Sequence, residues 1–178
     1  MAAVCQENST AKVLCRLNLV NPDLIQASLG DVNAAATMAG RHAVMRVHSL
    51  LQSTQPLVIE TTLSGSLARV QRLIERARRY GYFTVGVYVG LYSAELSALR
   101  VLERVARGGH SAPMERIHSR YAQSLANLRS CRARFDALLI LDNSEFNRKF
   151  QAVAMLSDGV LIWRDADQRP WLDAVLKD

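Results

Sequence analysis

Two carboxylates of this 178-residue chain occupy positions where a catalytic or binding group is expected. Glu60 directly follows the apolar run 57–59, which predicts a short strand, and Asp23 follows a predicted strand at residues 17–20. Both side chains would emerge at the carboxyl edge of a sheet, where one could act as general base and the other could bind substrate hydroxyls. The simpler interpretations are helix capping for Asp23 and an internal ion pair for Glu60.

Arginine dominates the basic residues of the chain. Nineteen of the 22 basic side chains are arginine, and the 16 acidic ones leave a net charge of +6. Residues 100–134 hold eight arginines against Glu103 and Glu115, so this segment accounts for the whole net charge. Guanidinium forks suit phosphate oxygens, which predicts a phosphorylated ligand; nucleic acid and a solvated helix face are the alternatives. Nucleic acid is the weaker of the two ligands, because only Tyr121 could stack on a base there.

The hydrophobic pattern alternates between short strands and amphipathic helices. Asn21 is a good N-cap, Pro22 is a good first helical residue, and Gly81 is typical of a helix C-terminus. Helices between successive strands predict an α/β fold with a mainly parallel sheet, in one domain over residues 1–178. The expected strands cover residues 1–5, 17–20, 57–59, 83–89, 137–141 and 160–163. The expected helices cover 11–16, a segment that begins at Pro22, 33–53, 66–80, 93–107, 114–130 and a short segment from Pro170.

Membrane and secreted classes are not expected. The longest apolar run, residues 137–141, is far shorter than the ~20 residues of a spanning helix, and the N-terminal residues lack the apolar core of a signal peptide. Cys5, Cys15 and Cys131 have no metal-ligand spacing, so we interpret them as small buried side chains in a reducing compartment. The expected location is therefore the cytoplasm.

Several motifs follow one another in a fixed order. They are Asn21-Pro22-Asp23; Glu60-Thr61-Thr62-Leu63-Ser64-Gly65; Gly81-Tyr82 before a strand; Arg100-Val101-x-x-Arg104-Val105-x-x-Gly108-Gly109-His110-x-x-Pro113; Ile117-x-x-Arg120-Tyr121-x-x-Ser124-Leu125-x-Asn127-Leu128; and Asp142-Asn143-Ser144. In this order they resemble the zeta-toxin-like group of P-loop kinases, from the first strand to at least residue 144. The resemblance implies a P-loop-kinase-like parallel sheet flanked by helices, with an arginine-rich helical lid at about residues 100–134.

The resemblance also implies an activity and its partners. Zeta toxins phosphorylate UDP-N-acetylglucosamine, so a nucleotide sugar is the implied class of substrate, and an antitoxin protein is an implied partner. Carried onto this chain, Asp23 takes the proton of the substrate hydroxyl, while Glu60, Thr61 and Thr62 bind the substrate. Nucleic acid is not an expected partner.

The same resemblance assigns three arginines to the phosphates of ATP. Arg104 and Arg120 are the implied catalytic arginines, which would stabilise charge during phosphoryl transfer, and Arg116 helps hold the nucleotide. The implied cofactors are ATP and Mg²⁺.

The phosphate-binding loop departs from the family pattern. A P-loop reads G-x-x-x-x-G-K-[ST], with glycines that let backbone N–H groups wrap the phosphates and a hydroxyl that holds Mg²⁺. Aligned on Lys12, this chain reads Gln6-Glu7-Asn8-Ser9-Thr10-Ala11-Lys12-Val13. Asn8, Thr10 and Lys12 are the expected nucleotide ligands, whereas Gln6 and Ala11 replace the glycines and Val13 cannot coordinate a metal. The sequence therefore leaves two functions open: a phosphotransferase with an altered P-loop, or an inactive pseudokinase that binds a ligand or a protein.

Overall fold

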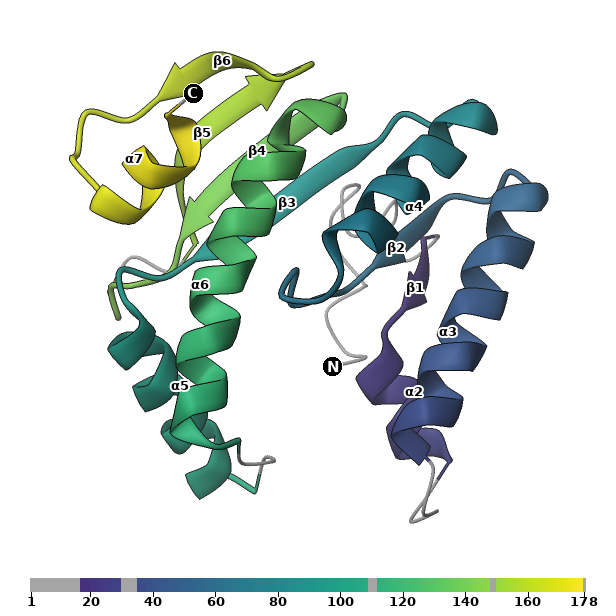
Figure 1. Cartoon of the computed structure of the whole chain (residues 1–178), viewed down its shortest axis with the longest axis horizontal. Coiled ribbons are helices and arrows are strands. Elements are labelled where there is room, and N and C mark those ends of the chain that lie inside the picture. Colours follow the sequence, from purple (N-terminus) through teal and green to yellow (C-terminus); the bar gives the residue numbers. More distant parts are fainter. Residues whose placement is uncertain (1–16, 30–34, 109–111, 148–149, 178) are drawn as a thin grey trace, which may run out of the picture. The chain divides into compact units, whose positions relative to one another are not determined.

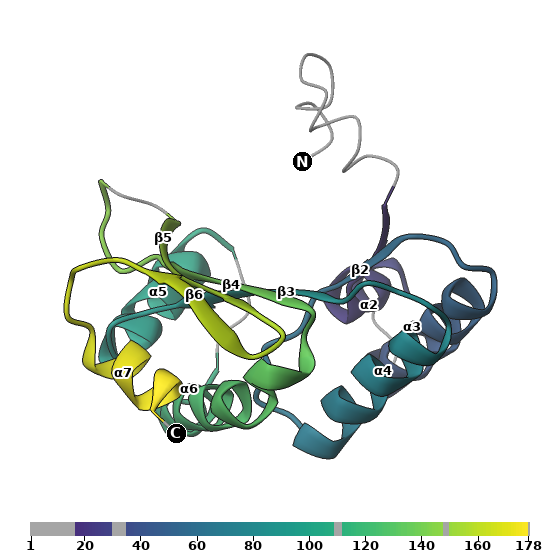
Figure 2. The ribbon, with the colours of Figure 1, turned by 90° about the horizontal axis from the view of Figure 1, so that it is seen from above.

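The computed structural model describes residues 17–29, 35–108, 112–147 and 150–177 (Figures 1 and 2). The chain divides into two compact units, the first ending at Thr61 and the second beginning at Thr62. The expectation of a single domain over residues 1–178 stays a prediction. None of the helices in the described part of the chain combines the length and the apolarity of a membrane span.

The first unit contains a pair of parallel strands joined by helices. β1 (Asn18–Val20) pairs with β2 (Leu57–Ile59), and α2 (Pro22–Ser28) and α3 (Ala35–Gln52) form the crossover between them. Buried side chains recur every four residues along α3, which also contacts β1. They are Ala39, Ala43, Val47 and Leu51. This spacing forms the apolar stripe of an amphipathic helix, so the expected strand–helix–strand unit is confirmed.

The second unit contains a four-stranded sheet in the order β3-β4-β5-β6. Its strands are β3 (Val85–Gly90), β4 (Ala137–Asp142), β5 (Gln151–Ser157) and β6 (Val160–Arg164). β3 and β4 are parallel, whereas β4–β5 and β5–β6 are antiparallel. The α/β class is therefore confirmed, but the sheet is mixed and the expectation of a mainly parallel sheet is corrected.

The correction comes from β5, which the hydrophobic pattern did not predict. β5 and β6 are joined by Asp158 and Gly159, with φ of +47° and +81°, and Ser157 pairs with Val160 across the turn. Two successive residues with positive φ define the tight hairpin turn whose twist matches that of paired strands. An Asp-Gly pair before an apolar run is a sequence signal for this hairpin, and it was available in the sequence.

The core of the second unit lies between its sheet and two of its helices. Figure 2 shows α6 (Met114–Cys131) and α7 (Pro170–Leu176) on the same side of the four-stranded sheet. α4 (Leu67–Arg79) and α5 (Ala94–Ala106) also contact or flank α6, and a short 3₁₀ turn, η1 (Arg132–Arg134), leads into β4. The buried cluster consists of Leu63, Leu128, Cys131, Leu138, Ile140, Val153, Ala154, Leu156, Trp171, Leu172 and Val175.

β3 shows the alternation that packs this core. Tyr88 packs against the cluster, with its ring centroid 6.4 Å from that of Trp171, while Val85 and Val87 on the opposite face are exposed. Gly90 lies directly under Trp171, and a Cβ at this position would overlap the indole ring. The glycine is therefore required by the close approach of the helix α7 side chain to the strand.

Cys131 is fully buried in this core, and burial raises the pKa of its thiol to about 11. The interpretation of Cys131 as a small core side chain is confirmed. Cys5 and Cys15, the expected strand at residues 1–5 and the expected helix at 11–16 lie outside the described residues.

Candidate functional site

The carboxyl ends of β1 and β2 place Asn21 and the predicted site residue Glu60 beside each other. Val20 and Ile59, the last residues of the two strands, are register partners, and the Glu60 N–H donates to the Val20 carbonyl at 3.2 Å. Because the strands are parallel, the residues that follow them leave the same edge of the sheet. Asn21 and Glu60 are those residues.

Asn21 connects the two carboxylate residues. Its side-chain amide donates to Glu60 Oε2 at 2.6 Å, and its carbonyl oxygen accepts from the Asp23 N–H at 2.8 Å and the Leu24 N–H at 3.3 Å. Asn21 therefore caps α2 and orients Glu60 with one side chain. The sequence predicted the cap, with Pro22 as the first helical residue, but it did not predict the contact with Glu60.

Asp23 and Glu60 are both exposed, as a group that must meet a ligand has to be. The side-chain amide of Asn21 holds the Glu60 carboxylate. Within the described residues, none of the contacts forms the internal ion pair that was the alternative interpretation of Glu60. A charge-assisted bond fixes one carboxylate oxygen and leaves the other available for a hydroxyl donor. The roles of Asp23 in accepting a proton and of Glu60 in binding hydroxyls stay predictions.

The other predicted substrate residues follow Glu60 along the chain. Thr61 is exposed and ends the first unit, while Thr62 is exposed and begins the second. The Thr62 hydroxyl is hydrogen-bonded to the Ser64 hydroxyl at 2.8 Å. Their roles in substrate binding stay predictions.

The three predicted phosphate arginines belong to the second unit. Arg104 lies in the last turn of α5, and Arg116 and Arg120 lie four residues apart on α6, where they share one face. All three are exposed. The expected arginine-rich helices are thus present, and their action as a lid over a nucleotide stays a prediction.

The predicted nucleotide ligands Asn8, Thr10 and Lys12 lie outside the described residues. So do the departures at Gln6, Ala11 and Val13. Within the part of the chain that the structure describes, no group of three or more His, Cys, Asp or Glu residues could hold a metal ion.

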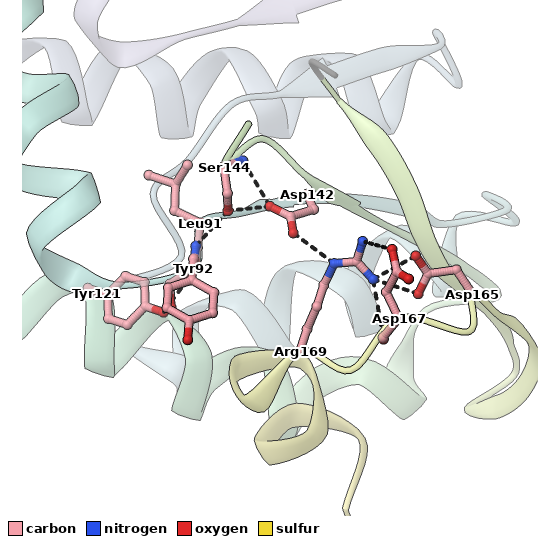
Figure 3. A network of polar contacts seen from close by, with 8 residues as sticks. All are labelled: Leu91, Tyr92, Tyr121, Asp142, Ser144, Asp165, Asp167 and Arg169. Atoms are coloured by element: carbon pink, nitrogen blue, oxygen red, sulfur yellow. Dashed lines mark hydrogen bonds and ion pairs between the residues drawn. The ribbon is translucent and has the colours of Figure 1, made fainter. Parts of the chain in front are cut away.

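A second group of polar side chains lies at the carboxyl ends of β3 and β4, and Figure 3 shows it from close by. Asp142 ends β4 and accepts from Arg169 Nε at 2.8 Å, while Arg169 Nη1 donates to Asp165 at 2.6 Å. Arg169 Nη2 lies 3.3 Å from Asp167. The guanidinium is buried, and it is compensated by three carboxylates on two different segments.

The charge of Arg169 is stabilised by these partners. Burial by itself lowers the pKa of Arg169, but the hydrogen bonds to Asp142 and Asp165 outweigh it, and the pKa is raised overall. Arg169 thus stays a cation that ties the loop after β6 to the end of β4. The sequence did not predict this cluster, because Asp142 and Arg169 are 27 residues apart and only the fold brings them together.

The loops beyond β3 and β4 are held by the same group. Asp142 accepts from the backbone and the hydroxyl of Ser144, and the Ser144 hydroxyl accepts from the Tyr92 N–H at 2.7 Å (Figure 3). The Tyr121 hydroxyl donates to the Leu91 carbonyl at 3.0 Å, and burial is the first cause that raises its pKa to about 12. A neutral phenol is the form that can donate this bond. The motif Asp142-Asn143-Ser144 is therefore built as a fixed loop at a strand end.

Arg100 faces this loop, unlike the three exposed arginines. Its guanidinium lies 4.1 Å from the centroid of the Phe146 ring, and its side chain is 23% exposed. The cation–π contact and the Glu103 partner at 3.4 Å orient it toward the end of β4. The sequence placed Arg100 at the start of one of the ordered motifs but assigned it no role.

The comparisons with known proteins concern the fold. The chain matches no family model and no curated protein. Its structure is similar to a chain from the PezAT chromosomal toxin–antitoxin system of the human pathogen Streptococcus pneumoniae, with a TM-score of 0.58 and 16% sequence identity. The similarity covers 92% of this chain and 67% of that chain. This similarity concerns the fold, and it agrees with the α/β class predicted from the sequence.

Proposed function

We propose that this chain is a zeta-toxin-like phosphotransferase that acts on a small hydroxyl-bearing molecule, a nucleotide sugar such as UDP-N-acetylglucosamine. The observation that supports it most is the link between Asp23, Asn21 and Glu60 at one sheet edge, with bonds of 2.8 and 2.6 Å. The likeness to a toxin–antitoxin structure and the ordered motifs support the same proposal, and an antitoxin protein is the corresponding partner.

We assign each predicted site residue a role in phosphoryl transfer. Asp23 takes the proton of the substrate hydroxyl. The hydroxyl oxygen then attacks the terminal phosphorus of ATP, and ADP is the leaving group. Glu60, oriented by Asn21, accepts hydrogen bonds from other hydroxyls of the substrate, together with Thr61 and Thr62. Arg104, Arg116 and Arg120 would neutralise phosphate charge, as guanidinium groups do well. ATP supplies the phosphoryl group, and Mg²⁺ would reduce the charge of its phosphates.

Titration of the full chain with ATP, with and without Mg²⁺, tests the nucleotide part of the proposal. We expect heat of binding that requires Mg²⁺ and disappears in Lys12→Ala. Lys177→Ala, which removes an exposed lysine that directly follows α7, is the matched control and should bind like the native chain. Absence of binding at millimolar ATP would contradict an ATP-dependent phosphotransferase.

Phosphate transfer to UDP-N-acetylglucosamine tests the carboxylates. Asp23→Asn should lower turnover by about 10²–10⁴-fold, the usual effect of a general base, while ATP binding is retained. Asp158→Asn removes an exposed carboxylate from the hairpin turn and should leave turnover unchanged. Binding of ATP without any turnover in the native chain would favour the pseudokinase, for which the replacements at Gln6, Ala11 and Val13 are the supporting observation.

A further inference from the structure

One face of α4 presents a row of arginines. Arg69, Arg72, Arg76 and Arg79 are separated by three, four and three residues, and all four are exposed. At 3.6 residues per turn this spacing confines them to an arc of about 80°, and at 1.5 Å per residue they extend along about 15 Å of the helix axis. The row lies outside residues 100–134, the segment that accounts for the net charge of the chain.

The opposite face of α4 fixes the direction of this row. Ile74 is buried, and Leu67 and Val70 pack against the core of the second unit. An amphipathic helix anchored by its apolar stripe must present the other face outward. The arginines therefore cannot turn inward without exposing that stripe.

The remaining charges of α4 are already compensated. Glu75 is paired with Arg134 at 2.8 Å, and Arg78 is paired with Asp136 at 2.6 Å. No ion pair within the described residues involves the three arginines at the ends and middle of the row, Arg69, Arg72 and Arg79. Arg69, Arg72 and Arg79 thus form a strip of positive charge that suits a negatively charged partner.

Exposed aromatic rings follow the row directly. The side chain of Tyr80 is 37% exposed and that of Phe83 is 72% exposed. Gly81, with φ of +78°, reverses the chain, and the Tyr82 N–H donates back to the Ala77 carbonyl at 3.1 Å. Phe83 follows this turn directly and lies four residues after Arg79 in the sequence.

We propose that the arginine face of α4 and Phe83 form a binding surface for single-stranded nucleic acid. Arginine forks contact phosphate oxygens, and an exposed ring stacks on an unpaired base. An acidic protein segment would neutralise the arginines but would offer no planar base to stack on Phe83. Single-stranded nucleic acid supplies both the phosphates and the base, so it fits the arginines and the ring together. Residues 100–134 contain a single aromatic residue, Tyr121, whereas exposed Tyr80 and Phe83 directly follow α4. The surface uses neither Asp23 nor Glu60 and is independent of the phosphotransferase.

Fluorescence anisotropy of a labelled 15-nucleotide oligouridine with the full chain tests the charge. We count one phosphate contact for each of Arg69, Arg72 and Arg79. Three contacts predict that the logarithm of affinity falls with the logarithm of salt concentration with a slope of about −2. Arg72→Gln combined with Arg79→Gln should weaken binding by about tenfold and bring the slope to about −0.7. The control is Arg41→Gln combined with Arg46→Gln, which removes the same charge from exposed positions of α3 and should change affinity by less than about twofold. Equal losses in the two double variants would overturn the proposal, since they would show an effect of net charge alone.

Substitution of Phe83 tests the stacking contact. Phe83→Leu keeps an apolar side chain of similar size and should weaken oligouridine binding by about fivefold or more, whereas Phe83→Tyr should retain it. Phe83 is exposed, so neither variant is expected to disturb the fold, which thermal denaturation checks. Unchanged binding in Phe83→Leu, together with equally tight binding of polyaspartate, would overturn the nucleic-acid proposal in favour of an acidic protein partner.

Discussion

At the scale of single residues, Asn21 makes the clearest link between local structure and the candidate site. Its carbonyl oxygen caps α2 and its amide nitrogen holds Glu60, so the start of the helix and the orientation of the carboxylate depend on each other. A serine at this position could still cap the helix but could not donate to Glu60 as an amide does. The two roles can therefore be separated by substitution.

Asn21→Ala should lower the free energy of unfolding by about 1 kcal/mol, because the Asp23 and Leu24 N–H groups lose their acceptor. Asn21→Ser should stay within about 0.5 kcal/mol of the native chain, since serine is an equally good cap. Both should weaken binding of the nucleotide sugar by a similar factor, because both release Glu60. Urea denaturation and titration calorimetry measure the two effects. Unchanged sugar binding in both variants would contradict a positioning role for Asn21.

Asp136 determines a pH dependence of stability. Hydrogen bonds from the Thr84 hydroxyl and backbone, both 2.6 Å, and then the Arg78 guanidinium hold the pKa of Asp136 below its usual range. A depressed pKa in the folded state adds stability above the unfolded value of about 3.9, and that stability is lost as pH falls through the folded pKa. Acid should therefore weaken the junction between α4, β3 and β4.

Asp136→Asn should lower the free energy of unfolding at neutral pH by about 1–3 kcal/mol, since the amide cannot accept as well from Thr84 and Arg78. The difference from the native chain should begin to shrink below about pH 4, where the carboxylate of the unfolded chain becomes protonated, and it should be lost as pH falls through the lower pKa of the folded state. Asp158→Asn is the control, because Asp158 is 74% exposed and lies 3.8 Å from Arg78. Urea denaturation at a series of pH values measures both variants, and a difference that stays constant down to acid pH would contradict the assignment.

At the scale of elements, the fit between β3 and α7 fixes the core of the second unit. Gly90→Ala would place a methyl group in the volume of the Trp171 ring, and we expect a loss of about 1–3 kcal/mol from the free energy of unfolding. Gly40→Ala on α3 has open space around the new methyl group and should add up to about 1 kcal/mol, because alanine favours a helix. Chemical denaturation distinguishes the two, and tolerance of alanine at Gly90 would show that Trp171 can move.

The elements that could be predicted from the sequence are those with local signals. The start of α2 follows from Asn21 and Pro22, and the end of α4 follows from Gly81, because caps and left-handed residues act within one turn. β5 was not predicted, since its outward residues are partly apolar and no clear alternation marks it. The turn at Asp158 and Gly159 was the local signal that could have revealed it.

In the candidate site, the positions of residues at strand ends could be predicted, but the contacts between their side chains could not. Asp23 and Glu60 could be placed at one sheet edge because each follows a short strand, and parallel pairing brings such ends together. The contact through Asn21 requires the register of two strands 39 residues apart, which no local pattern contains. The contact between Arg169 and Asp142 likewise depends on tertiary structure.

At the scale of the whole molecule, net charge proved a coarse guide to surfaces. The net charge of +6 of the chain equals that of residues 100–134, so the total gives no sign of the arginines on α4. The arginines of α4 are balanced in the total by acidic residues in other parts of the sequence, but a binding partner meets the face of a helix and not a sum over the chain. A structure was needed to show which arginines are paired and which face outward.

The division into two units leads to a last prediction. All members of the buried cluster lie between Leu63 and Val175, so a fragment of residues 62–178 retains every side chain of that core. Because burial of apolar surface is the main stabilising contribution, we expect this fragment to fold by itself and to unfold cooperatively. Trp171 is 5% exposed, and its emission should shift to longer wavelength in a single transition with urea. Gly90→Ala should lower the midpoint of that transition in the fragment as it does in the full chain. A fragment with solvent-exposed tryptophan emission and no transition would show that the second unit needs residues 1–61 for its stability.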